Sequence, residues 1–204
     1  MATAKTCGRV RTKILCFGAS MTEGYTSDGN GYFPYGFALQ DMLGTEEYEV
    51  TVSGNSGETT GDLLKRLSSV LSFGPFDVVI VLGGTNDVGM ELPLNESERH
   101  LRGITKLIQH HKATAVLLSI PPCGRSLFMA EGPFLVPRQK DLNARIKQIC
   151  IDESAVFVDL FTHVADAACR LPDDLSDEDG LHLSRRGYVK LAKAVHDTLV
   201  KLQV

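Results

Sequence analysis

Three features of the sequence predict an α/β fold, a three-layer α/β/α sandwich around a parallel sheet of about five strands. Short apolar runs alternate along the chain with segments whose apolar residues recur at helical spacing. The runs are almost continuously apolar, as at 77–82 (Asp-Val-Val-Ile-Val-Leu), which is typical of strands buried on both faces of a parallel sheet. No linker, repeat or change in composition divides the chain.

The expected elements follow one another in regular order. We expect strands at 13–18, 48–53, 77–82, 113–120 and 155–160. We expect helices at 35–43, 63–71, 97–112 and 138–151, then a short helical stretch and a last helix that Ser184 caps. Segments 25–34, 123–137 and 172–180 are predicted to be loops or irregular chain, and the third of these is acidic.

Length and composition limit the classes of protein to consider. The chain has 204 residues, 43% hydrophobic and 23% charged, which predicts a flexible arm at 1–11 and one globular domain at 12–204. The net charge of -4 argues against a nucleic-acid partner, and no apolar run has the length of a membrane span. Five widely spaced cysteines without a Cys-x-x-Cys pair, and no apolar secretory signal, predict a cytoplasmic protein with reduced thiols.

A glycine-bounded turn, 18–24 (Gly-Ala-Ser-Met-Thr-Glu-Gly), follows the first expected strand. Ser20 therefore stands where a strand ends and a helix begins, beside backbone N–H groups that have no partner within the helix. Such a serine can attack a carbonyl group if the chain supplies a base. It can also cradle a phosphate together with Thr22 and Thr26, as in a flavodoxin-like flavin-binding module.

The strongest candidate for the base is His182, in the segment 179–184 (Asp-Gly-Leu-His-Leu-Ser). The carboxylate of Asp179, three residues earlier, can accept the imidazole Nδ1–H and leave Nε2 free for the serine proton. Ordering of a helix N-terminus is the alternative role of this pair. Acyl transfer also needs donors at the oxyanion, and the candidates are the N–H groups of Ser20 and Gly57 and the side-chain amide of Asn86. Each also fits an ordinary turn.

Four blocks in order give the chain a resemblance to the SGNH hydrolases, also called GDSL esterases/lipases. They are 18–24 (Gly-Ala-Ser-Met-Thr-Glu-Gly), 55–60 (Asn-Ser-Gly-Glu-Thr-Thr), 84–87 (Gly-Thr-Asn-Asp) and 179–182 (Asp-Gly-Leu-His), so the resemblance spans nearly the whole chain. It implies a flavodoxin-like SGNH fold and a serine esterase without metal or cofactor that acts on a small-molecule ester. It further implies Ser20 as nucleophile, Asp179 and His182 as its partners, and Ser20, Gly57 and Asn86 as oxyanion donors.

The chain departs from the family pattern at Ala19, where the family has Asp, so a carboxylate near the nucleophile turn is missing. We expect an active enzyme, with a catalytically weak member of the family as the alternative. Segments 25–34 and 123–137 are expected to wall the acyl pocket. Its apolar lining is predicted to be Phe33, Phe128, Met129 and Phe134, although ordinary packing would use the same residues.

Overall fold

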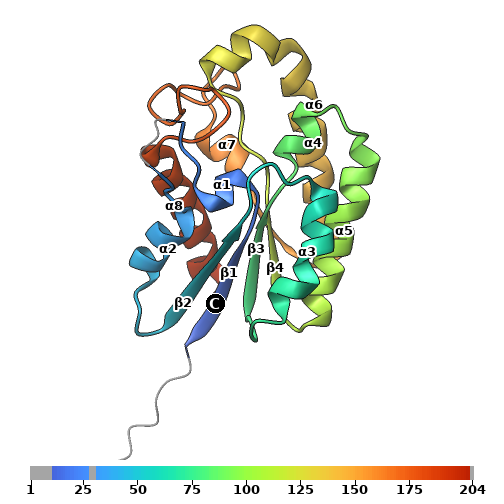
Figure 1. The fold of residues 1–204 in the computed structure, drawn as a ribbon, viewed down its shortest axis with the longest axis vertical. Helices are drawn as coiled ribbons and strands as arrows, with labels where there is room; N and C mark the ends of the chain where they lie inside the picture. Colours follow the sequence, from blue (N-terminus) through green and yellow to red (C-terminus); the bar gives the residue numbers. More distant parts are fainter. Residues whose placement is uncertain (1–10, 28–30, 203–204) are drawn as a thin grey trace, which may run out of the picture.

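A computed structural model describes residues 11–27 and 31–202 (Figure 1). Five parallel strands form one sheet in the order β2-β1-β3-β4-β5, which confirms the predicted α/β class. The predicted N-terminal arm lies outside the described residues, apart from Arg11. The strands are β1 (Thr12–Gly18), β2 (Tyr48–Gly54), β3 (Val78–Leu82), β4 (Thr114–Leu118) and β5 (Val156–Val158).

Helices cover both faces of the sheet, as predicted (Figure 1). α2 and α8 pack against each other on one face, and α3, α5 and α6 lie together on the other. The short helices α1 and α4 begin just beyond β1 and β3. The helices are α1 (Ser20–Glu23), α2 (Tyr35–Leu43), α3 (Thr60–Leu71), α4 (Thr85–Gly89), α5 (Leu94–His110), α6 (Arg125–Asp152), α7 (Leu160–Val164) and α8 (Arg185–Leu202).

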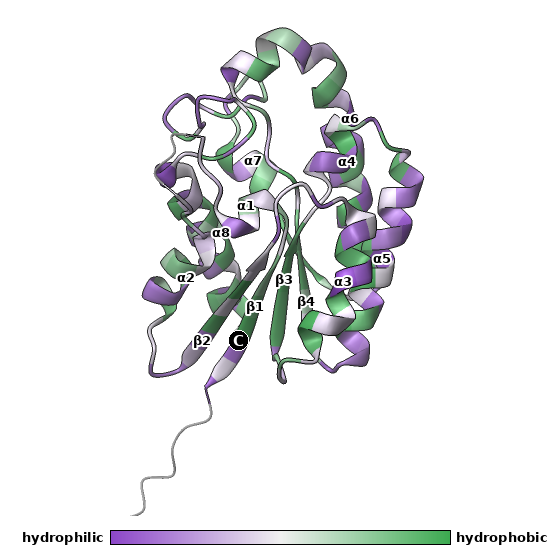
Figure 2. Cartoon of the chain, viewed as in Figure 1, coloured by the Kyte–Doolittle hydropathy of each residue, from purple (hydrophilic) through white to green (hydrophobic). Residues whose placement is uncertain are grey.

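The core lies on the central strands. Every residue of β3 is buried, and so are the last five of β1. Figure 2 shows these strands as a hydrophobic centre, with hydrophilic residues on the outer sides of the helices. Cys16 and Cys150 are buried there, as predicted. At the last helix, the Gly187 N–H donates to Ser184 Oγ at 3.2 Å, so Ser184 is the expected cap.

The strand register brings three turns to one edge of the sheet. Gly18, at the end of β1, pairs with Gly54 of β2 on one side and with Leu82 of β3 on the other. The chain passes from β1 outward to β2 and then returns across β1 to β3. Strand order reverses at this point, and such a reversal opens a crevice at the carboxyl ends of the strands.

The prediction of irregular chain at 123–137 is wrong, because helix α6 begins at Arg125 and continues through Pro133 and Pro137. Each proline lacks the N–H that would bond four residues back, at a cost of about 3 kcal/mol. Tertiary contacts offset this cost. Leu135 is buried in the core, and Arg138 donates to the Leu92 carbonyl at 2.7 Å. In Figure 1 the first part of α6 arches over the end of the sheet and the rest runs beside α5.

Helix α5 begins at Leu94, three residues before the predicted start. Ser97 is a favourable capping residue by type. The Ser97 hydroxyl instead donates to the buried carboxylate of Asp87 at 2.8 Å, so Ser97 lies within the helix and does not cap it.

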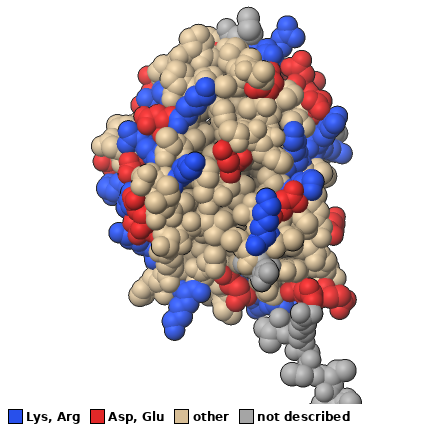
Figure 3. Space-filling model, turned by 180° about the vertical axis from the view of Figure 1, so that it is seen from behind, with Lys and Arg blue, Asp and Glu red and all other residues tan. Residues whose placement is uncertain are grey.

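None of the helices within the described ranges is both long enough and apolar enough to cross a membrane. On the face shown in Figure 3, separate side chains of both signs are scattered over a largely uncharged surface, so the described part of this face carries no continuous basic strip. Such a strip is the usual electrostatic footprint of a nucleic-acid-binding protein.

Candidate active site

Ser20 is the first residue of α1, two residues beyond the end of β1. Two glycines make this turn possible. A side chain at Gly18 would meet the Leu82 carbonyl oxygen at 2.3 Å, and Gly24 has a φ of +84°. The Ser20 N–H donates to no acceptor within residues 11–27 and 31–202, because the turn's own bonds begin with the N–H groups of Thr22 and Glu23, both to the Ala19 carbonyl.

His182 lies beside Ser20 although 162 residues separate them in the chain. Its Nε2 is 2.9 Å from Ser20 Oγ, and its Nδ1 is 2.6 Å from Asp179 Oδ2. An ionised carboxylate can only accept, so Nδ1 carries the hydrogen of this bond. In the neutral imidazole Nε2 is then the acceptor for the serine hydroxyl proton. The structure therefore brings together the three side chains that the sequence singled out.

Asp179 is held ionised by its own loop. Burial by itself raises the pKa of this carboxyl, but the His182 side chain and the N–H groups of His182 and Leu181 all donate to it and lower the pKa to about 2. The pair sits in the turn that precedes α8, so Asp179 both shapes this turn and orients the imidazole.

Asn86 and Gly57 flank the nucleophile turn from β3 and β2. Asn86, in α4, lines a small hollow of about 10 Å³ together with Ser20, which is room for about one water molecule. One Asn86 Nδ2 hydrogen is donated to the Glu58 carbonyl at 2.8 Å, and a primary amide has a second to offer. Gly57 has a φ of +82° and open space where a side chain would be. Within the described chain its N–H donates to no acceptor.

Residues that the sequence interpretation did not assign contact the turns that carry these groups. Arg66 forms an ion pair with Glu58 at 2.7 Å, and Glu23 of α1 accepts the Ser56 N–H at 3.0 Å. Glu58 precedes α3 by two residues and Arg66 lies within it, eight positions on, whereas Glu23 and Ser56 are 33 positions apart. Neither separation matches the three- or four-residue spacing of a helix pair, so the sequence alone did not indicate these contacts.

The sequence gives Asp87 no role of its own beyond its place in the block 84–87, yet the structure buries it to 1% exposure. It accepts the N–H and the hydroxyl of Thr60 and the hydroxyl of Ser97. This carboxylate ties α4, next to Asn86, to the start of α3, three residues beyond Gly57. The polar run after a buried strand was a signal for it, since a charged group placed there must find donors.

On the base side, the ring of Tyr25 lies 4.6 Å from the His182 ring, centroid to centroid. The Tyr188 hydroxyl donates to the Tyr25 carbonyl at 2.7 Å. Burial and the nearby carboxylates of Asp177 and Asp179 raise the pKa of Tyr188, which keeps this donor protonated. Tyr25, the first residue of segment 25–34, therefore lies against the imidazole of His182.

The predicted apolar lining is not gathered at Ser20. Phe128 lines a hollow of about 470 Å³ with Pro133, Pro137 and Cys169. Phe134 is 41% exposed and stacks with Arg138. Phe33 is half-buried beneath the guanidinium of Arg185. The side chain of Met129 is outside what the structure describes. Among the described residues, none of these three phenylalanines lines the hollow at Ser20.

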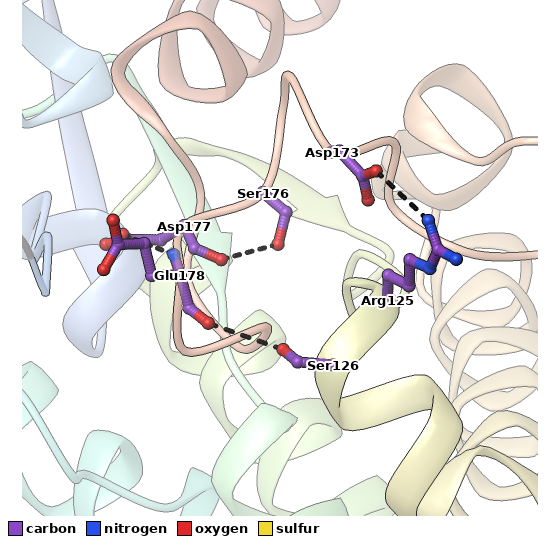
Figure 4. A pocket seen from close by; sticks show the side chains of 6 residues that line it. All are labelled: Arg125, Ser126, Asp173, Ser176, Asp177 and Glu178. Carbon is purple, nitrogen blue, oxygen red and sulfur yellow. Dashed lines mark hydrogen bonds and ion pairs between the residues drawn. The ribbon is translucent and has the colours of Figure 1, made fainter.

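A wider hollow of about 460 Å³ lies between the loop before Asp179 and the first turn of α6 (Figure 4). Polar and charged residues line it, and Figure 4 shows most of their side chains joined to one another or to the backbone by hydrogen bonds and one ion pair. Within the described residues, no group of three His, Cys, Asp or Glu side chains could hold a metal ion. The residues that line this hollow are Arg125, Ser126, Asp173, Ser176, Asp177 and Glu178.

Comparison with known proteins gives this geometry a family. The profile of the GDSL-like lipase/acylhydrolase family matches residues 16–190, which include Ser20, Gly57, Asn86 and His182. The chain belongs to this family. It is a carboxylic ester hydrolase, as its sequence blocks predicted, and the flavin-binding alternative loses its support. A search of curated proteins finds no match.

Solved structures of the same fold cover nearly the whole chain. A Streptococcus pneumonia structure named for platelet activating factor is 30% identical, with a TM-score of 0.77 over 95% of this chain and 86% of that one. The lipase/acylhydrolase from Enterococcus faecalis is 24% identical, with a TM-score of 0.78 over 94% and 96%. A carbohydrate acetylesterase family member from Sinorhizobium meliloti is 19% identical, with a TM-score of 0.77 over 94% and 98%. The last two establish likeness of fold alone.

Proposed function

We propose that this GDSL-family hydrolase cleaves small carboxylic esters through an acyl-enzyme on Ser20, with His182 as the base and Asp179 as its orienting partner. The observation that carries the proposal is the pair of contacts at His182, 2.9 Å from Nε2 to Ser20 Oγ and 2.6 Å from Nδ1 to the Asp179 carboxylate. A nucleophile, a base and a group that orients the base, each within hydrogen-bond reach of the next, are the recurring arrangement of serine hydrolases.

In the proposed first half-reaction Ser20 Oγ bonds to the ester carbonyl carbon while its proton passes to His182 Nε2. The carbonyl oxygen becomes an oxyanion, which the N–H groups of Ser20 and Gly57 and the free amide hydrogen of Asn86 stabilise. The tetrahedral intermediate collapses when the bond to the alcohol oxygen breaks. His182 returns the proton to that oxygen, and the alcohol leaves.

In the second half-reaction water attacks the acyl-enzyme and gives its proton to His182. The second tetrahedral intermediate collapses, Ser20 Oγ takes the proton back, and the carboxylic acid is released. Protons balance within each half-reaction. Asp179 keeps its charge throughout, since its pKa of about 2 lies far below that of an imidazole.

We infer a preference for short acyl groups, because the hollow that Ser20 lines has room for about one water molecule and Phe128 lines a separate hollow. The relative from Sinorhizobium meliloti is itself named for acetyl esters. We therefore expect p-nitrophenyl acetate to have a higher kcat/KM than the butyrate, and the octanoate to be the poorest of the three.

The test compares hydrolysis of these three esters by wild type, Ser20→Ala and His182→Ala. Removal of either side chain should lower kcat by about 10³-fold or more. An alkyl phosphonate should label wild type and leave Ser20→Ala unlabelled. Equal turnover by wild type and Ser20→Ala would refute the role of Ser20. Very slow turnover by wild type with normal phosphonate labelling would favour the catalytically weak alternative, and Ala19→Asp would then be the first variant to test.

A further inference from the structure

The side chain of Arg66 connects three segments that meet at the candidate site. From α3 it reaches back to the edge of the sheet, where Nη2 donates to the Gly18 carbonyl at 3.1 Å and Nη1 donates to Ser53 Oγ at 2.6 Å. These residues lie at the ends of β1 and β2, just before the turns that carry Ser20 and Gly57. The guanidinium also stacks over the Phe17 ring at 4.5 Å. These contacts therefore fix the strand ends from which the nucleophile turn and the glycine turn begin.

The third segment is reached through Glu58. Arg66 Nε donates to this carboxylate at 2.8 Å and Nη2 donates at 2.7 Å, which is the bidentate geometry that gives an ion pair directional strength. The side chains are only 23% and 11% exposed, so water screens the pair weakly. The same carboxylate accepts from Asn55 Nδ2 at 2.8 Å. Glu58 is thus held by its side chain on both sides of the turn.

The backbone of Glu58 carries this restraint to the proposed oxyanion donors. Its carbonyl accepts one Asn86 amide hydrogen at 2.8 Å, and its preceding neighbour is Gly57. Gly57 makes no packing contact where a side chain would be. Its φ of +82° lies in the left-handed region, where glycine has more conformational freedom than any other residue. Its orientation therefore depends on its neighbours, Ser56 bound to Glu23 and Glu58 bound to Arg66.

We propose that Glu58 and Arg66 are positioning residues of the oxyanion site. Their ion pair fixes the backbone around Gly57 and Glu58, and with it the direction of the Gly57 N–H and the rotamer of Asn86, relative to Ser20. Neither side chain touches the substrate. This inference rests on the proposed function, because it assigns the pair a task within the oxyanion site described there.

A pair with this task acts on the transition state more than on the bound ester, because the oxyanion exists only after attack by Ser20. Loosening the backbone around Gly57 and Glu58 should therefore lower kcat and leave KM nearly unchanged. It should also weaken a trifluoromethyl ketone, whose adduct on the serine bears a negatively charged oxygen.

The experiment compares Glu58→Gln, Arg66→Gln, the double variant and Arg66→Lys in the full chain. We expect about tenfold to 100-fold losses in kcat for the single variants, matched by losses in trifluoromethyl ketone affinity, with KM within about twofold. The double variant should be no worse than the poorer single one, because both remove the same pair. Lysine keeps the charge without the planar fork and should rescue little.

A matched control is the Arg102–Glu153 pair, at 2.9 Å and with similar exposure of 27% and 16%. Glu153 precedes β5 and so lies at the opposite end of the sheet. Glu153→Gln should lower the melting temperature and leave kcat unchanged. If Glu58→Gln behaves in the same way, the pair only stabilises the fold and the inference is overturned. The isosteric Glu58→Gln keeps one hydrogen bond, so it can be measured even if Arg66→Gln does not fold.

The two levels of the proposal fail differently. Wild type without turnover, or equal turnover by wild type and Ser20→Ala, would refute the proposed function. An active wild type, an inactive Ser20→Ala and a fully active Glu58→Gln would leave that function in place and refute the positioning role alone.

Discussion

The two halves of the candidate site are held by different kinds of interaction. On the oxyanion side, Ser20, Gly57 and Asn86 follow three adjacent strands, and charged groups tie their turns together. Arg66 and Glu58 form one tie, and the buried Asp87 forms another. These contacts are short, bidentate or multiple, and mostly shielded from water.

On the base side, His182 comes from an irregular segment between α7 and α8. The contacts that place it are mainly backbone hydrogen bonds and ring packing. The Asp177 N–H donates to the His182 carbonyl at 2.9 Å, and the Gly124 N–H donates to the Gly180 carbonyl at 2.7 Å. The Tyr25 ring lies against the imidazole. The charged group on this side that touches the histidine is Asp179.

From this difference we expect the groups of the oxyanion side to be held rigidly and the position of His182 on the base side to vary more easily. Strand ends in register place the first set of groups without help from distant loops. The base reaches Ser20 only when several loops have packed, so its position depends on weaker and more numerous contacts. Substitutions on the two sides should therefore differ in what they change, as the following predictions state from the largest effect to the smallest.

The largest effect is expected on the base side, from Asp179→Asn. An asparagine can present an N–H to Nδ1, which favours the tautomer in which Nε2 carries the hydrogen and cannot accept the serine proton. We expect a loss in kcat of about 10³- to 10⁴-fold, measured with p-nitrophenyl acetate. A loss of less than tenfold would show that the loop orients His182 without this carboxylate.

Next is Asn86→Ala on the oxyanion side, which removes a proposed donor. We expect kcat to fall by about 10²- to 10³-fold with little change in KM. Asn143→Ala is the matched control, because this amide also bonds to backbone, donating to the Ile120 carbonyl at 3.0 Å. The control should lose stability and keep kcat. Similar kinetics for the two variants would return Asn86 to a structural role.

Asp87→Asn tests the buried tie of the oxyanion side. Asparagine would place an NH₂ group where Thr60 and Ser97 now donate to a carboxylate. We expect a loss of about 2–4 kcal/mol in the free energy of unfolding, measured in urea. Asp141→Asn, at an exposed ion pair on α6, should cost less than about 0.5 kcal/mol. Equal losses for the two variants would contradict the role given to Asp87.

The pH dependence of the unfolding free energy tests the environment of Asp179 independently of its proposed role in catalysis. Its pKa in the folded chain, about 2, is below the ordinary value of 3.8, so folding favours the charged form. The stabilisation is therefore complete above about pH 4 and disappears as the pH falls through 2. We expect the difference in unfolding free energy between wild type and Asp179→Asn to shrink by up to about 2 kcal/mol over this window. A constant difference would rule out the lowered pKa.

The smallest effect is expected from Ser27→Ala, which removes one of the two contacts to Asp177. The Ser27 hydroxyl donates to this carboxylate at 2.8 Å, and the Ser27 N–H donates to it as well. Because the contact is exposed, we expect a loss of about 0.5–1 kcal/mol in stability. If the base side is adjustable, kcat should fall about threefold. A loss above about 30-fold would show that the base side is as rigid as the other.

Much of this arrangement was predictable because it is local. Strands β1 and β3 are apolar runs with a glycine at or just beyond their ends, and parallel strands that end together put Ser20 and Asn86 at one edge. The pairing of Asp179 with His182 follows from a three-residue spacing. The contact between His182 and Ser20 was an expectation drawn from chemistry and from the family blocks, since nothing in the spacing of the two residues requires it.

Other features escaped the sequence interpretation for identifiable reasons. Pro133 and Pro137 argued against a helix, and the burial of Leu135 outweighed them. The expected lining by Phe128 and Phe134 assumed that an irregular segment would fold over the site. Instead, the segment is helical, and these two rings lie against the guanidinium groups of Arg138 and Arg170.

By itself the sequence determined the layers of the fold, the family and the four blocks that supply the candidate site, because apolar periodicity and turn chemistry act over a few residues. Only the tertiary structure decided which partner each charged side chain contacts. Packing of the elements brings Arg66 to Glu58, and it also brings the carboxylates of Asp87 and Asp177 to the donors on Thr60 and Ser27. A buried or half-buried charge must then be matched by the donors and acceptors that the fold brings to it.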